Sequence, residues 1–385
     1  MALTKLSTDV IDLSGNTEAL TIPSGTSANR PTSPAEGLLR DNTTTGALEF
    51  YDGSIWQQIA GTLVPDYSPP VGTDHFMPTL FNGNNTTVTT GFQADFVWLA
   101  NRQYANGNFI YDSVRGASNN LWPTSNDAEG VRSGVTAFNP TSTTIGTYAS
   151  IGSGGSGNNV QWAWKAGGTA VSNPDGTTTS TISKNATSGF SIVKTSSAGG
   201  TINVGHGLGS DIGMIILKGV DVAEAWQVWH KDVGTGKYLQ LSSDAAPTTR
   251  TNSFSTVSST IFENDWTSGS VVWIAYCFAD VTDYQKMGTY TGAVGKEITL
   301  GFQPRFVLIK RIDSAYNWLI YDSVRGSSGA LNDRYAILPD SGASAEITSS
   351  VVFVNFTSTG IDFPNSYGGK NATGGEYIYL SLIHI

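Results

Sequence analysis

Residues 106–117 read NGNFIYDSVRGA, and residues 316–327 read YNWLIYDSVRGS. The phrase YDSVRG therefore occurs twice in one chain. Self-similarity at long range is the sequence signature of a repeated structural unit. The phrase predicts that the chain is an array of one β-rich unit. It also argues against a single-pocket enzyme, because duplicated units seldom each carry a separate active site.

The match extends upstream of this phrase. Residues 91–99 (GFQADFVWL) correspond to residues 301–309 (GFQPRFVLI). A divergent middle copy lies between the two, where residues 214–218 (MIILK) take the place of residues 306–310 (FVLIK). Each copy closes on an aromatic segment, at residues 160–164, 274–278 and 377–380. We therefore predict three repeats, which span residues 75–167, 186–281 and 286–385.

The composition favours short strands joined by polar turns. Charged residues make up only 14% of the 385 residues, well below the usual level of about a quarter, and there are 44 glycines. The apolar runs are short and rich in β-branched and aromatic residues, as at residues 306–309, and no window holds a helical apolar period over three turns. We predict an all-β chain, in which an N-terminal β-hairpin module precedes three tandem antiparallel β-sandwich units of the jelly-roll or lectin-like kind.

Residues 1–70 differ from the repeats and form the predicted N-terminal segment. Residues 38–56 (LLRDNTTTGALEFYDGSIW) read as three short strands separated by an NTTTG turn and a DG turn. A single hairpin is marginally stable in water. We therefore expect this segment to pair with copies of itself or with a neighbouring protein. Residues 64–71 read as an extended, proline-containing linker.

The net charge and the apolar runs of the chain disfavour nucleic acids and membranes as binding partners. The net charge of −10 disfavours nucleic acid, whose phosphates call for a basic surface, and it disfavours an anionic membrane surface. No apolar run is long enough to span a bilayer, and the N-terminus has no apolar segment typical of a signal peptide. Cys277 is the only cysteine, which excludes an internal disulfide framework.

The repeated phrase contains a pair of opposite charges three residues apart. Asp112 and Arg115 recur as Asp322 and Arg325. We interpret them as a structural turn motif, in which the carboxylate and the guanidinium pair across a turn and bind its backbone groups. The alternative makes the aspartates metal ligands or catalytic acids. The middle copy carries HKD at residues 230–232 instead, a change that a duplicated catalytic motif would not be expected to survive.

Three tryptophans lie near predicted loops and are the candidate ligand-binding residues. Trp122, Trp229 and Trp266 could stack on sugars or other planar ligands. The alternative, which we favour, is that most of them are core or subunit-contact residues, because large aromatic side chains dominate both environments.

The remaining chemistry-bearing residues form no recognisable constellation. The four histidines have no metal-ligand spacing with cysteine or carboxylates. The glycine-rich residues 205–210 (GHGLGS) are followed by no predicted helix that could bind phosphate. We predict no catalytic residue, no metal and no cofactor.

Two sets of residues resemble known phage proteins. ANRPTSP at residues 28–34, with LRDNTTTG at residues 39–46, resembles the attachment hairpin of phage tail-fibre and virion structural proteins. The strings HGLG, GTYTG, GFQP and WLIYDSVRG are similar to a β-sandwich domain common in structural proteins of marine tailed phages; they stand at residues 206–209, 288–292, 301–304 and 318–326. The resemblance covers nearly the whole chain, and the family offers no catalytic residues to transfer.

The resemblance implies a non-enzymatic virion protein, made in the host cytoplasm and carried on the tail or capsid surface. As a tail fibre or similar appendage it would form a homo-oligomer, with a trimer expected, and would attach to other virion proteins through residues 1–70. The sandwich array would contact host cell-surface glycans or neighbouring virion subunits. The alternatives are a capsid decoration or tail scaffold without a receptor, and a carbohydrate-active enzyme on a sandwich scaffold.

The last residues depart from the family pattern. Residues 380–385 (LSLIHI) resemble the translation of a sequencing-library transposon end. We therefore expect them to be foreign to the natural protein and the third repeat to be cut short.

Overall fold

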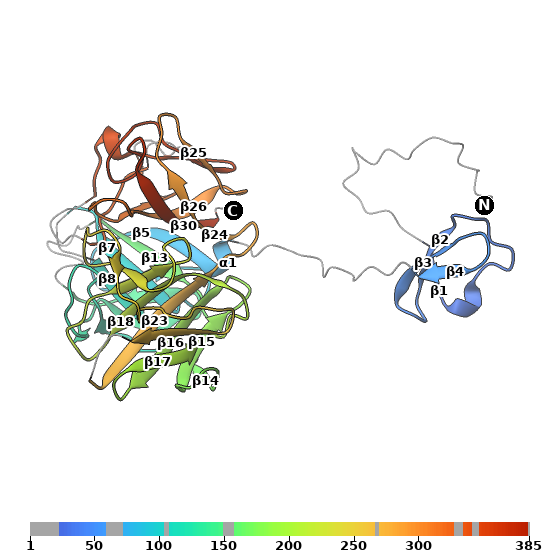
Figure 1. Cartoon of the computed structure of the whole chain (residues 1–385), viewed down its shortest axis with the longest axis horizontal. Helices are drawn as coiled ribbons and strands as arrows, with labels where there is room; N and C mark the ends of the chain where they lie inside the picture. Colours follow the sequence, from blue (N-terminus) through green and yellow to red (C-terminus); the bar gives the residue numbers. More distant parts are fainter. Residues whose placement is uncertain are drawn as a thin grey trace. The chain divides into compact units, whose positions relative to one another are not determined.

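The chain divides into two compact units, Met1–Ser68 and Pro69–Ile385. We refer to them as the N-terminal module and the body. The structure is a computed structural model that describes residues 23–58, 72–103, 108–148, 158–265, 269–326, 334–340 and 346–383. Strands dominate the described residues (Figure 1), which confirms the predicted all-β fold.

The N-terminal module is a four-stranded sheet in the order β1-β2-β3-β4. Its strands are β1 (Ser24–Gly25), β2 (Leu39–Asn42), β3 (Ala47–Tyr51) and β4 (Trp56–Gln58). Strands β2, β3 and β4 are the predicted antiparallel ones, and β1 adds a parallel edge. The turn from β2 to β3 closes on Gly46, whose positive φ of 66° suits a residue without a side chain.

Repeat 1 packs a four-stranded sheet, β5-β13-β7-β8, with a three-stranded sheet, β11-β12-β6, and a small ribbon, β10-β9. It follows the short helix α1 (Gly72–His75). Its strands are β5 (Phe76–Asn82), β6 (Thr86–Thr89), β7 (Phe96–Asn101), β8 (Asn108–Asp112), β9 (Asn119–Asn120), β10 (Gly130–Val131), β11 (Val135–Asn139), β12 (Ser142–Ile145) and β13 (Asn158–Trp164).

Repeat 2 has an equivalent sheet of its own, with additional strands at both edges, in the order β14-β15-β16-β23-β18-β19-β20-β21. Its second sheet is the pair β17-β22. Its strands are β14 (Val171–Asn173), β15 (Ser180–Asn185), β16 (Phe190–Ser197), β17 (Thr201–Gly205), β18 (Ile212–Gly219), β19 (Gln227–His230), β20 (Lys237–Gln240), β21 (Thr248–Thr249), β22 (Ile261–Asp265) and β23 (Val271–Ala279). We assign β14 and β15 to this repeat because they pair with its sheet, although they precede residue 186, the predicted start of the repeat.

Repeat 3 returns to the simpler plan, with sheets β24-β30-β26-β27 and β25-β29-β28. Its strands are β24 (Gln285–Thr291), β25 (Glu297–Thr299), β26 (Pro304–Arg311), β27 (Leu319–Asp322), β28 (Asn355–Thr357), β29 (Gly360–Asp362) and β30 (Glu376–Ile383). Residues 380–383, expected to be foreign, lie within β30, and their side chains are buried.

The strand register makes the three repeats comparable residue by residue. Phe96 pairs with Asp112, Met214 with His230, and Phe306 with Asp322. This is the correspondence expected from the sequence alignment, including its divergent middle copy. Equivalent positions can therefore be followed around the body.

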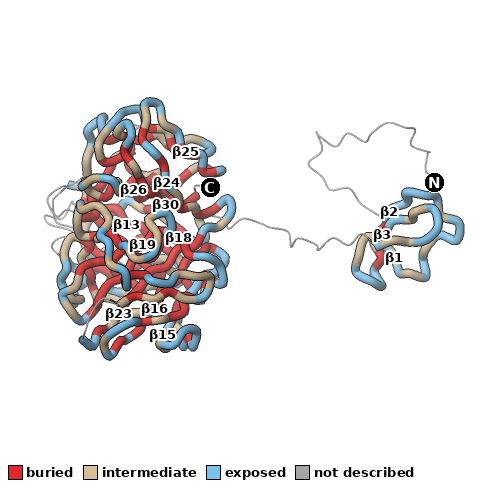
Figure 2. Tube along the Cα trace, viewed as in Figure 1, coloured by how far each residue is buried: buried red, intermediate tan, exposed pale blue. Residues whose placement is uncertain are grey.

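The repeats share one hydrophobic core. Its buried side chains come from all three repeats, while two smaller cores lie within repeats 1 and 2. The Phe96 ring of repeat 1 lies 4.4 Å from that of Tyr276 in repeat 2, and the Phe76 ring lies 5.5 Å from that of Phe306 in repeat 3. Strand β7 is buried along its whole length, as a strand covered on both faces should be. Buried segments accordingly run through the interior of the body (Figure 2).

None of the helices among the described residues has the length and apolar character needed to cross a bilayer.

Candidate functional site

The Asp–Arg motif lies in the interior of the body. The Asp112 carboxylate is 2.5 Å from Arg115 Nε, and the Asp322 carboxylate is 2.6 Å from Arg325 Nε. In both copies the backbone N–H of the arginine also donates to the aspartate, at 2.8 and 3.0 Å. The side chains are at most 1% exposed. The motif therefore closes its own turn, as the spacing predicts.

A glutamate completes each of these buried networks. Arg115 Nη1 lies 2.7 Å from Glu129, and Arg325 Nη1 lies 3.2 Å from Glu346. Burial alone would lower the pKa of Arg115, but the neighbouring Asp112, Tyr276 and Glu129 outweigh it and raise that pKa above its usual value. The guanidinium is thus held as a cation inside the body.

The same aspartates bind the next repeat. Tyr276 of repeat 2 donates to Asp112 at 2.7 Å, and Trp162 of repeat 1 donates through Nε1 to Asp322 at 2.7 Å. The equivalent residue of repeat 2, His230, places its Nε2 3.3 Å from the Tyr379 carbonyl of repeat 3. Repeat 1 thus contacts repeat 2, repeat 2 contacts repeat 3, and repeat 3 contacts repeat 1.

A second set of equivalent hydrogen bonds joins the same three pairs of repeats. The three donor side chains occupy equivalent positions in the repeats, and so do the three backbone carbonyls that accept from them. Trp226 donates to the Trp122 carbonyl at 2.8 Å, and Trp318 donates to the Gln240 carbonyl at 2.9 Å. In the third joint, Asn108 donates to the Leu338 carbonyl at 3.3 Å.

These two sets of contacts close the repeats into a ring with approximate threefold symmetry. The sequence predicted repeats and adjacent cores, but it gave no sign that repeat 3 returns to repeat 1. The buried carboxylates and arginines of the motif are saturated by contacts within the ring. This geometry favours the structural interpretation over the metal-ligand or catalytic one. Among the described residues, no group of three or more His, Cys, Asp or Glu side chains could hold a metal ion.

The joint between repeats 2 and 3 lacks the ion-pair network. At the positions of Asp112, Arg115 and Glu129, repeat 2 carries His230, Val233 and Pro247. Proline has no N–H, whereas the corresponding Glu129 N–H donates across its joint to the Val220 carbonyl at 2.7 Å. A shallow hollow of about 260 Å³ lies there, lined in part by Val233, Pro247 and Ile312.

The three candidate tryptophans differ in their environment. The Trp229 side chain is 5% exposed within the core of repeat 2, where β19 lies between β18 and β20, which favours the core interpretation over the ligand-binding one. Trp122 is half-buried, and the Arg132 guanidinium stacks over its ring at 5.6 Å. Trp266 lies outside the described residues.

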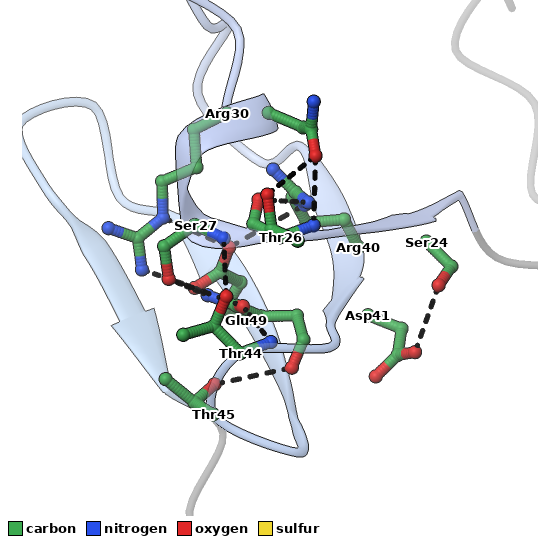
Figure 3. A network of polar contacts seen from close by, with 11 residues as sticks. Ser24, Thr26, Ser27, Arg30, Arg40, Asp41, Thr44, Thr45 and Glu49 are labelled. Carbon is green, nitrogen blue, oxygen red and sulfur yellow. Dashed lines mark hydrogen bonds and ion pairs between the residues drawn. The ribbon is translucent and has the colours of Figure 1, made fainter.

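The interior of the N-terminal module is polar, a feature that the sequence analysis missed. Glu49 is fully buried and accepts hydrogen bonds from Arg30 Nη2 at 2.5 Å and from Asn42 Nδ2 at 2.8 Å, while Arg40 Nε lies 3.5 Å away (Figure 3). The hydrogen bond from Arg30 is the main reason that the pKa of Glu49 is lowered. The strand pairing explains the arrangement, since Arg40 and Glu49 are directly opposite each other in β2 and β3.

Several large apolar side chains of the module are exposed. Leu39 and Phe50, also paired across β2 and β3, are each 37% exposed, and Ile55 is 57% exposed. Within residues 23–58, the only buried side chains are Arg40, Asn42 and Glu49. The described part of the module therefore has a polar interior and leaves its large apolar side chains in contact with solvent.

One family model matches residues 71–384, and its description is Domain of unknown function (DUF7483). The chain belongs to this family. The matched range is nearly that of the body, so a DUF7483 domain contains the whole ring of three repeats. Comparison with curated proteins finds no match.

Proposed function

We propose that this chain is a non-enzymatic structural protein of a tailed-phage particle, a tail fibre or similar appendage. The N-terminal module joins copies of the chain and attaches them to other virion proteins, and the DUF7483 body is displayed on the particle. The observation that carries the proposal is that the described part of the module buries only polar side chains while Leu39, Phe50 and Ile55 are exposed. The resemblance of residues 28–56 to phage attachment hairpins supports the same assignment.

The physical argument begins with the interior of the module. Small domains that bury too little apolar surface usually need a disulfide, a metal or oligomerisation to be stable. The described residues 23–58 bury no apolar side chain and contain no cysteine, and no metal-binding group occurs among the described residues. Oligomerisation remains, and the exposed Leu39 and Phe50 offer the surface that it would cover.

The body supports a display role. Its buried charges join repeats to one another, and the shared core makes them one compact unit. A rigid body of this kind can present surface grooves and loops at fixed positions, and several copies on one oligomer would bind a surface with multiplied strength.

Light scattering coupled to size-exclusion chromatography of the full chain tests the proposal. We expect a homo-oligomer, most simply a trimer, that dissociates in the double variant Leu39→Asp/Phe50→Asp. Val294→Asp is the matched control, because this valine is 88% exposed on the body and its substitution should leave the mass unchanged. A monomeric wild-type chain would refute the proposed role of the module.

A further inference from the structure

A groove of about 520 Å³ lies at the edge of the large sheet of repeat 2. Strands β14, β15 and β16 form its base, and Val114 from the Asp–Arg turn of repeat 1 borders it. Its size is within the range of ordinary ligand sites.

The strand register places polar side chains in rows on one face of this sheet. Ser172 pairs with Thr181, and Thr181 pairs with Lys194. In the neighbouring row, Ser196 pairs with Val272. Because alternate residues of a strand share a face, Lys194 and Ser196 point to the same side. A cation, several hydroxyls and an apolar side chain therefore meet in one groove.

The ammonium of Lys194 has no partner among the described residues. The side chain is half-buried, and no ion pair or hydrogen bond joins it to a described residue. Ser180 also borders the groove, but it alternates with Thr181 along β15, so its buried hydroxyl faces the opposite side of the sheet. A cation without a protein partner, beside a row of hydroxyls, suits an anionic ligand that also forms hydrogen bonds.

The groove is specific to repeat 2. Strand pairing places Leu80 of repeat 1 and Thr289 of repeat 3 at the position of Lys194. Leucine is apolar, and the Thr289 hydroxyl already donates to the Tyr377 carbonyl at 2.8 Å. Strands β14 and β15 have no counterpart in the four-stranded sheets of the other repeats. The site therefore does not follow from the repeat architecture.

The chemistry of the lining indicates the class of ligand. Serine and threonine hydroxyls both donate and accept hydrogen bonds, as sugar hydroxyls do. Among the described residues of the lining, Lys194 is the only charged one and none carries a carboxylate, although the chain as a whole has a net charge of −10. A ligand that is rich in hydroxyls and carries a negative charge matches this combination.

We propose that the groove binds an acidic saccharide. The carboxylate of a uronic or sialic acid unit pairs with Lys194, while sugar hydroxyls bond to Ser172, Thr181 and Ser196. The assignment deepens the proposed function, on which it rests, because it names the surface through which the displayed body contacts a host glycan.

Isothermal titration calorimetry of the full chain tests this site. The ligands are oligogalacturonate, a sialylated trisaccharide, a neutral maltooligosaccharide and inorganic phosphate. We expect binding of at least one acidic saccharide and weaker or no binding of the neutral one. Lys194→Met should weaken that binding roughly tenfold or more, the size of a lost charge-assisted hydrogen bond. Lys237→Met, which removes an exposed lysine from β20 of the same repeat, should leave it unchanged.

Three outcomes would overturn the assignment: no binding of either acidic saccharide, binding that Lys194→Met leaves intact, or binding of phosphate as tight as that of the saccharide. The oligomer mass measured in the same samples separates this site from the role of the module. Leu39→Asp/Phe50→Asp should abolish the oligomer but keep the affinity of each groove for the saccharide. Lys194→Met should weaken saccharide binding and leave the oligomer intact.

Discussion

Asp322 shows how a single buried residue can hold two parts of the body together. Its carboxylate binds Arg325 within repeat 3 and accepts a hydrogen bond from Trp162 of repeat 1. Replacing it with alanine would leave the Arg325 guanidinium buried with one acidic partner fewer. Removing one partner of a buried pair typically costs about 3–5 kcal/mol. We expect Asp322→Ala to lower the free energy of unfolding of the body, measured in urea, by this amount.

Asp313 provides the matched control for Asp322. It also pairs with an arginine of repeat 3, Arg311, but its side chain is 34% exposed. Exposed ion pairs contribute at most about 1 kcal/mol, so Asp313→Ala should have a small effect. Equal losses for the two variants would contradict the structural role of the buried motif.

His206 and His230 make the stability of the body depend on pH. Burial lowers the pKa of each to about 4. In both, Nδ1 accepts a backbone N–H while Nε2 faces a carbonyl, a geometry that suits the neutral ring. The unfolded chain binds a proton below pH of about 6.5, whereas the folded chain does so only near pH 4. Their contribution to stability is therefore present above pH 6.5 and is lost as the pH falls towards 4.

Urea unfolding between pH 7 and pH 4 measures this dependence. The double variant His206→Asn/His230→Gln should show a shallower loss of stability with falling pH than the wild type. Asp340 acts in the opposite direction, because burial raises its pKa to about 6, and its contribution is common to both proteins. An unchanged slope in the variant would show that these histidines do not control the acid response.

At the scale of single elements, the paired strands β2 and β3 depend on Glu49. This carboxylate is the shared partner of Arg30, Arg40 and Asn42, and no apolar core replaces it in the described module. We expect Glu49→Ala to destabilise the module by about 3 kcal/mol or more, because two arginines lose their buried partner. Amide hydrogen exchange should then be fast in residues 39–51 and unchanged in the body.

Glu36→Ala is the control for this element, because Glu36 is exposed and its loss should leave exchange in the module slow. Protection of residues 39–51 in the Glu49→Ala variant would mean that the apolar face, rather than the polar interior, determines the fold of the module.

Local patterns predict most of these elements. Short apolar runs such as residues 306–309 become the central strands, and the NTTTG turn joins β2 to β3. Local patterns leave burial open where it depends on a strand from elsewhere in the chain. The sequence places Trp229 near a loop and leaves two interpretations, and only the flanking strands β18 and β20 show that it is buried. The groove at Lys194 was missed for the same reason, since it arises only when β14 and β15 pair with β16.

At the scale of the whole body, the sequence predicts three copies but not their closure. The contacts that close the ring join residues far apart in the chain, and no local pattern reports such distances. The ring explains why YDSVRG is retained in two copies, because each Asp–Arg pair both closes a turn and binds a neighbouring repeat. It also fits the extent of the family match, which treats the three repeats as one domain.

The joint between repeats 1 and 3 tests this closure most directly. Arg102 of repeat 1 donates to Glu346 of repeat 3 at 3.0 and 2.8 Å, with the side chains 20% and 6% exposed. A double-mutant cycle of Arg102→Met and Glu346→Gln in the full chain measures their coupling through the free energy of unfolding of the body. A closed ring predicts a coupling energy of about 1–2 kcal/mol. Additive effects, with a coupling energy within about 0.3 kcal/mol of zero, would contradict the ring.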